Sequence, residues 1–145
     1  MATRSSISLQ RDNGEIISVY CHWDGYPEYN GKILKEHYTT MEKIEKLIAL
    51  GNMSSLAENI YPAVGQEHSY SNPQENVCVF YHRDRNEDWK HTQPAIHNSV
   101  EEMIRFYKNS WCEYHYLFID GEWKCYDDIE HEVSNKDKEE IDIPF

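Results

Sequence analysis

Residues 5–23, SSISLQRDNGEIISVYCHW, contain the clearest structural signal in this chain. Polar and apolar side chains alternate from Ser5 to Gln10, and a run rich in β-forming residues follows from Glu15 to Trp23. The segment between them, Asp12-Asn13-Gly14, is typical of a tight hairpin turn, because Asn and Gly tolerate the positive φ that such turns require. The pattern predicts a β-hairpin. Both faces of its second strand carry apolar or aromatic side chains, so we expect that strand to be central in its sheet.

Two helices are predicted from their N-terminal signals. Thr39 precedes Glu42 by three residues, which is the spacing of a capping box, and Gly51 is placed to end the helix that follows. The same capping pattern recurs from Ser99 to Glu102 and predicts a second helix.

Three further strands are predicted, at 77–81, 111–119 and 122–126, and the turn Asp120-Gly121 joins the last two in a second hairpin. The order of elements is hairpin, helix, strand, helix, hairpin. This order predicts an α+β domain with a mostly antiparallel sheet of about five strands and two helices packed on one face.

Composition separates a body from a tail. The chain has 145 residues and a formal net charge of −12, from 14 basic and 26 acidic side chains. Residues 128–145 contain seven acidic and two basic side chains, so we expect a single domain over 1–127 and an acidic C-terminal tail over 128–145. Bulk attraction to nucleic acid or to an anionic membrane surface is disfavoured, because it would bring like charges together.

The sequence also favours a soluble, cytoplasmic protein. We find no signal-peptide pattern near Met1 and no apolar run of the roughly 20 residues that a membrane span needs. The four cysteines are not arranged as C-x-x-C, and without a secretory signal we expect reduced, buried thiols.

The densest group of chemically useful side chains lies in residues 20–28, YCHWDGYPE. Here Trp23 and Tyr26 offer stacking faces, His22 a hydrogen-bonding or acid-base group, and Asp24 and Glu28 acceptors, at a strand end and the loop beyond it. The alternative is local structure, in which Asp24 and Gly25 form a turn. These residues lack the ligand spacing that marks a zinc site, so no metal is predicted.

Arginines are concentrated in the segment YHRDR, residues 81–85. Arg83 and Arg85 follow a predicted strand, and guanidinium groups match phosphate or carboxylate in bidentate geometry. The alternative is a solvated turn in which the neighbouring Asp84, Glu87 and Asp88 neutralise both arginines.

Aromatic side chains share one face of the strand predicted at 111–119, namely Tyr114, Tyr116 and Phe118. This face suits a stacking platform for bases, a sheet face covered by helices, or a self-association surface. We find no glycine-rich phosphate loop, no nucleophile elbow and no Cys/His nucleophile pair, so neither a catalytic residue nor a cofactor is predicted.

The chain resembles a group of small proteins of tailed phages and prophages, most of them without an assigned function. The resemblance covers roughly residues 3–126. It depends mainly on YCHWDGYPE at 20–28, with weaker matches at TRS (3–5) with Ile7, NG (30–31), EHY (36–38), GNMSSL (51–56), RDR (83–85) and residues 114–123. It implies an accessory protein made in the cytoplasm of an infected or lysogenic bacterial cell, and it implies no catalytic residue.

These observations predict a phage-type accessory binding protein, acting as a homo-oligomer, that inhibits or sequesters a component of a host defence system. The target is either a host protein or a small nucleotide-like ligand. The predicted binding residues are His22, Trp23, Asp24, Tyr26, Glu28, Arg83 and Arg85. The alternative is a small hydrolase or transferase that uses His22 with Asp24 or Glu28.

Overall fold

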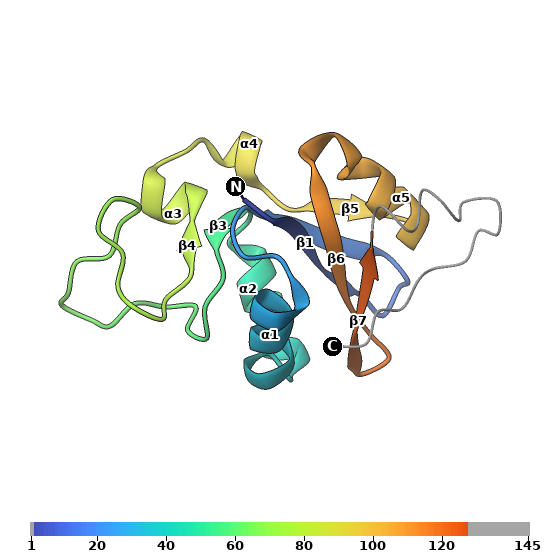
Figure 1. Cartoon of the computed structure of the whole chain (residues 1–145), viewed down its shortest axis with the longest axis horizontal. Coiled ribbons are helices and arrows are strands. Elements are labelled where there is room, and N and C mark those ends of the chain that lie inside the picture. The colour runs from blue at the N-terminus through green and yellow to red at the C-terminus, as the bar shows by residue number, and fades with distance from the viewer. Residues whose placement is uncertain (1, 128–145) are drawn as a thin grey trace.

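A mixed β-sheet organises residues 2–127, the part of the chain that this computed structural model describes (Figure 1). The described strands are β1 (Arg4–Gln10), β2 (Ile16–Cys21), β3 (Met53–Ser55), β4 (Val79–Phe80), β5 (Ala95–His97), β6 (Cys112–Ile119) and β7 (Glu122–Asp127). Their order across the sheet is β4-β3-β2-β1-β6-β7, and β5 also pairs with β2.

Both predicted hairpins are confirmed. β1 pairs antiparallel with β2, from Ser5 opposite Cys21 to Gln10 opposite Ile16, and β6 pairs antiparallel with β7. β2 has neighbours on both sides, which agrees with its predicted central place. The hairpins are joined through a parallel pairing of β1 with β6, and β2 pairs in parallel with β3.

Most helices are short. They are α1 (Lys32–His37), α2 (Met41–Ala49), α3 (Tyr81–Arg85), α4 (Trp89–Thr92) and α5 (Val100–Phe106), with single turns η1 (Pro27–Gly31) before α1 and η2 (Lys108–Ser110) after α5. The predicted cap of α5 is confirmed, because Ser99 Oγ accepts from the Glu102 N–H. α2 begins one residue later than predicted: its N-cap is Thr40, whose hydroxyl accepts from the Lys43 N–H.

Helices cover both faces of the sheet (Figure 1). Along β1, Ile7 and Leu9 belong to the larger buried cluster, which also contains apolar side chains of α1 and α2. The intervening Ser8 points the other way, and its hydroxyl donates to the Met103 sulfur on α5 at 2.9 Å. Side chains of α5 form a second cluster there with Ile16 and Leu117.

The predicted five-stranded, mostly antiparallel sheet with two helices on one face is therefore wrong. The sheet has seven strands, of which β1 with β6 and β2 with β3 are parallel pairs, and five α-helices accompany it in the described residues. The two strands that the sequence does not predict, β3 and β5, have three residues each and are too short to show an alternating pattern. The strand predicted at 77–81 is only Val79–Phe80 (β4), because α3 begins at Tyr81. The β1–β6 pairing joins segments far apart in the chain, which no local pattern specifies.

Burial settles two other expectations. All four cysteines are buried thiols that take part in no disulfide bond, as predicted. Tyr116 is fully buried and Phe118 is 5% exposed, so their face of β6 belongs to the core and is not an open stacking platform.

No helix within residues 2–127 has the length and apolar character needed to cross a membrane. The predicted acidic tail, 128–145, lies outside the described residues.

Candidate functional site

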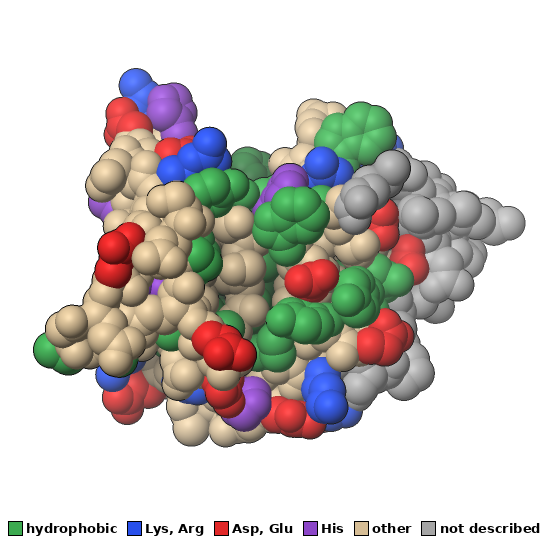
Figure 2. All heavy atoms as spheres, turned by 60° about the vertical axis from the view of Figure 1, so that its left-hand side comes forward, with side chains coloured by type: hydrophobic (Ala, Val, Ile, Leu, Met, Phe, Trp, Pro, Cys, Tyr) green, Lys and Arg blue, Asp and Glu red, His purple; other side chains and the backbone are tan. Residues whose placement is uncertain are grey.

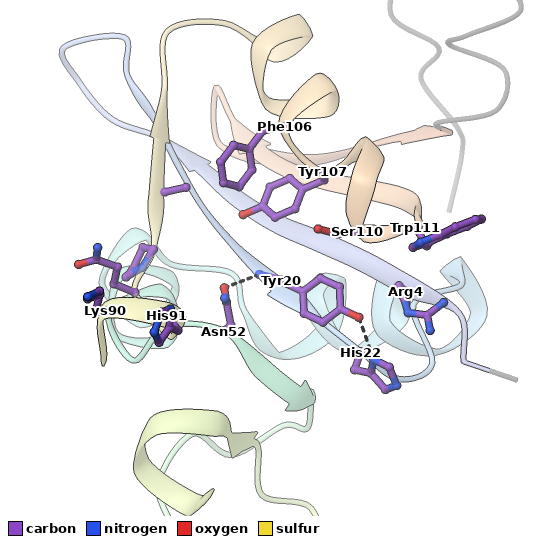
Figure 3. Close-up of a pocket in the computed structure, with 13 residues that line it drawn as sticks. Arg4, Tyr20, His22, Asn52, Lys90, His91, Phe106, Tyr107, Ser110 and Trp111 are labelled. Carbon is purple, nitrogen blue, oxygen red and sulfur yellow. Dashed lines mark hydrogen bonds between the residues drawn. The ribbon is translucent and has the colours of Figure 1, made fainter. Parts of the chain in front are cut away.

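A cavity opens where the two partners on one edge of β2 diverge. β5 pairs with β2 over Ile16–Ser18, whereas β3 meets it only at Cys21. Tyr20 lies between these pairings, and its backbone N–H donates instead to Asn52 Oδ1 at 2.9 Å. The cavity at this point, which we call the β2-edge cavity, has a volume of about 730 Å³ (Figure 3). This volume is in the usual range for small-molecule sites.

The charged side chains that line the β2-edge cavity are all basic. Arg4 comes from the start of β1 and Lys90 from α4, and two histidines, His22 and His91, line it as well. None of the 13 residues drawn in Figure 3 is Asp or Glu. Acidic side chains are instead scattered over the outer surface, as Figure 2 shows for one face. In a chain with a net charge of −12, such segregation creates a local preference for anions.

A tyrosine and a histidine are paired in the cavity. Both side chains lie on the same face of the chain, as their spacing of two residues predicts, and the Tyr20 hydroxyl lies 2.8 Å from His22 Nδ1. Burial, with a smaller contribution from the Arg4 charge, lowers the pKa of His22 below its usual 6.5. The imidazole is therefore neutral at pH 7. When Tyr20 donates to Nδ1, the remaining ring N–H at Nε2 is a hydrogen-bond donor.

An exposed tryptophan lies at the mouth of the cavity, beside Arg4 (Figure 3). Trp111 is 76% exposed, and it has a φ of 63°, in the left-handed region. A bulky residue rarely adopts this conformation, because its Cβ crowds the following carbonyl. Backbone strain of this kind often occurs at functional sites. An indole held open to solvent next to a guanidinium is suited to stack against a flat ligand ring.

The wall that carries Phe106 and Tyr107 is fixed by a buried polar network. The Tyr107 hydroxyl and His97 Nε2 each lie 2.7 Å from Ser18 Oγ, which joins α5, β5 and β2. The Phe106 ring also contacts the His97 ring edge to face, with centroids 5.0 Å apart. Burial raises the pKa of Tyr107 and lowers that of His97, so both groups are neutral at pH 7.

The opposite wall is fixed by a close backbone contact. The Asn52 N–H donates to the Thr92 carbonyl at 2.7 Å, which holds the end of α4 against the start of β3. At the neighbouring Gly51, where φ is +87°, a Cβ would clash with the same carbonyl oxygen and approach the Trp89 ring. Glycine is therefore required here for α4 to present Lys90 and His91 to the cavity.

The loop predicted to bind a ligand is tied to the sheet, and only His22 of its five candidate residues lines the β2-edge cavity. The Gly25 N–H donates to the Thr3 carbonyl at 2.8 Å, and the buried Tyr116 hydroxyl donates to the Gly25 carbonyl at 2.6 Å. Trp23 is 43% exposed and contacts the His22 ring edge-on. Of the remaining candidates, Asp24 and Tyr26 lie further along this loop and Glu28 lies in η1. Burial and the Asp24 carboxylate raise the pKa of Tyr26. Their role in binding stays a prediction.

The two candidate arginines do not line the β2-edge cavity either. The Arg83 guanidinium pairs with Asp84 and donates to the carbonyls of Ile60 and Cys78, at 2.7 and 2.9 Å. It thus holds a loop onto β4. Arg85 lies over the Tyr70 ring, 4.4 Å from its centroid. The structure does not bring the loop and these arginines together in that cavity.

Sequence reasoning missed Arg4, Lys90, His91 and Trp111. They come from three separate segments, none of which forms a motif by itself, and the sequence pattern predicts Trp111 at the start of a strand. Within the described residues, no group of three or more His, Cys, Asp or Glu side chains is arranged to hold a metal ion.

No protein-family model, curated protein sequence or solved structure gives a significant match to this chain.

Proposed function

We propose that this protein binds a small anionic ligand with an aromatic ring, of the nucleotide class, in the β2-edge cavity. The observation that carries the proposal is the lining itself, in which basic and aromatic side chains meet without a carboxylate in a strongly acidic protein.

Each part of such a ligand has a partner. Arg4 offers a guanidinium for a phosphate, and charge-assisted hydrogen bonds of this kind are about twice as strong as neutral ones. Trp111 offers a stacking face, which contributes about 1 to 3 kcal/mol per base in proteins that bind nucleic acid. A ring and a phosphate bound together should therefore bind more tightly than either alone.

We further propose that the ligand is held unchanged. His22 is hydrogen-bonded to Tyr20, and neither Asp24 nor Glu28 lines the cavity with it. The acid-base pair required by the alternative hydrolase or transferase is thus not supported at this site.

The resemblance to phage and prophage proteins supports a setting for this activity. We propose that the protein is an accessory factor of an infected bacterial cell that lowers the free concentration of a nucleotide-like defence signal. Sequestration requires only binding without turnover, with the protein present in excess over its ligand.

Calorimetric titration with three matched probes tests the proposal: a nucleoside 5′-monophosphate, the uncharged nucleoside and inorganic phosphate. We expect the nucleotide to bind most tightly. Arg4→Gln should weaken its binding about tenfold, which corresponds to a loss of roughly 1.4 kcal/mol of binding free energy. Arg11→Gln is the matched control, because Arg11 pairs with Glu15 outside the cavity and its loss removes the same charge. Equal loss in both variants, or no binding of any nucleotide, would contradict the proposal.

Sequestration has a separate test. Nucleotide incubated with protein is recovered after heat denaturation and analysed by mass spectrometry. We expect to recover the intact nucleotide, whereas a converted product in excess of one equivalent of protein would establish an enzyme.

A further inference from the structure

The basic groups of the β2-edge cavity are divided between two ends. Figure 3 shows Arg4 and His22 at one end, beside Trp111, and Lys90 and His91 at the other. Asn52 and Tyr20 lie between them along the floor of the cavity. The two basic ends come from different elements, β1 and the residue that follows β2 on one side and α4 on the other.

This arrangement is poorly matched to a ligand with one anionic group. A single phosphate bound at Arg4 leaves Lys90 without a counter-charge in the site, although the fold fixes the α4 wall through Asn52, Thr92 and Gly51.

We infer that the ligand of this cavity carries two separated anionic groups joined by a ring-bearing body, one bound at Arg4 and the other at Lys90. Dinucleotides and nucleoside bisphosphates belong to this class. The inference rests on the proposed function and specifies its ligand. Trp111 stacks on the ring near the Arg4 end, and the middle of the ligand lies over Asn52.

The test compares three probes that differ in the number and spacing of their phosphates: a nucleoside 5′-monophosphate, a nucleoside 3′,5′-bisphosphate and a 5′-phosphorylated dinucleotide. Affinities are measured for wild type, Lys90→Gln and the control Lys46→Gln. Lys46 pairs with Glu42 on α2 and does not line the β2-edge cavity, so the control makes the same change in net charge elsewhere.

The inference expects wild type to bind at least one two-phosphate probe more tightly than the monophosphate. Lys90→Gln should weaken that probe about fivefold, the size expected for one solvent-exposed charge pair, and weaken the monophosphate by a clearly smaller factor. Salt should weaken the two-phosphate probe more steeply than the monophosphate.

Two results would overturn the inference while leaving the proposed function intact. One is equal binding of all three probes. The other is a Lys90→Gln variant that binds every probe like wild type, or that weakens all three by the same factor. Failure of wild type to bind any of the probes would instead remove the proposed function, and this inference with it.

Discussion

At the level of single residues, a substitution of Trp111 separates an effect on ligand binding from an effect on stability. Its indole is 76% exposed, so it contributes little to the core, and its backbone has a φ of 63°. Asn adopts this conformation more readily than Trp. Trp111→Asn should leave the free energy of unfolding unchanged or raise it by up to about 1 kcal/mol, while nucleotide affinity falls about tenfold through lost stacking. Urea unfolding and calorimetry measure the two effects separately.

Trp23→Ala provides the comparison for that variant. Trp23 is also exposed and touches His22, yet it does not line the β2-edge cavity, so its removal should not change affinity. Loss of binding in Trp23→Ala with normal binding in Trp111→Asn would instead favour the loop predicted from the sequence.

The residue pattern of β2 explains why only part of the site was predictable. Alternation along a strand places Tyr20 and His22 on one face, and that inference holds. The remaining partners of His22 in the cavity, such as Arg4 and Lys90, come from segments brought together only by the tertiary fold. Proximity in sequence to His22 was a poor guide, because the residues after it form a loop anchored on Thr3 and Tyr116.

At the level of elements, the packing of α4 on the start of β3 can be tested through a pair of glycines. Gly51 and Gly65 have similar positive φ values, +87° and +83°, but a Cβ would clash only at Gly51. Gly65→Ala should cost about 1 kcal/mol of stability from backbone strain alone, and Gly51→Ala roughly 1 to 3 kcal/mol more from overpacking. Only Gly51→Ala should weaken binding of a two-phosphate nucleotide, because it displaces the wall that carries Lys90. If Gly51→Ala and Gly65→Ala had equal effects in the unfolding and binding assays, the close contact between Gly51 and the Thr92 carbonyl would be refuted.

The network beneath α5 predicts a dependence of stability on pH. Burial lowers the pKa of His97 below 6.5 in the folded protein, against a smaller opposing effect of Glu102. The unfolded chain therefore binds a proton at His97 more readily than the folded protein does. The contribution of neutral His97 to the free energy of unfolding is complete above about pH 6.5 and is lost as pH falls toward the folded-state pKa.

Urea unfolding between pH 7.5 and 5.5 measures that loss. His97→Gln should reduce the slope of stability against pH, whereas His22→Gln should retain the part due to His97, even though burial also lowers the pKa of His22. A His97→Gln variant with the wild-type slope would show that protonation of His97 does not cause the dependence of stability on pH.

Elements with strong local signals were predicted well. The turn at Asp12-Asn13-Gly14 and the cap at Ser99 each depend on neighbouring residues, and both hairpins and α5 are where the sequence indicates. By contrast, β5 has three residues and acquires its strand conformation from β2, through Ile16–Ser18. Its position depends on tertiary pairing, so no pattern within the segment predicts it.

At the level of the whole molecule, the parallel pairing of β1 with β6 determines the architecture. It joins the two hairpins into one sheet and leaves helices on both faces, whereas the sequence predicted a mostly antiparallel sheet covered on one side. It also places the start of β1, with Arg4, next to Cys112 and hence near Trp111 at the cavity mouth. The error in the predicted fold and the failure to predict Arg4 and Trp111 therefore have a common cause.

Binding in the β2-edge cavity is tested by the indole N–H signals of the four tryptophans, followed by ¹H–¹⁵N NMR during nucleotide titration. Trp111 lines the cavity, whereas Trp23 does not. The Trp123 indole N–H donates a hydrogen bond to the Tyr38 carbonyl. Once assigned with Trp111→Asn, the Trp111 signal should shift in a saturable way, with much smaller changes at Trp23 and Trp123. A Trp111 signal that stays fixed at millimolar nucleotide, or a response confined to Trp23, would contradict binding in the β2-edge cavity.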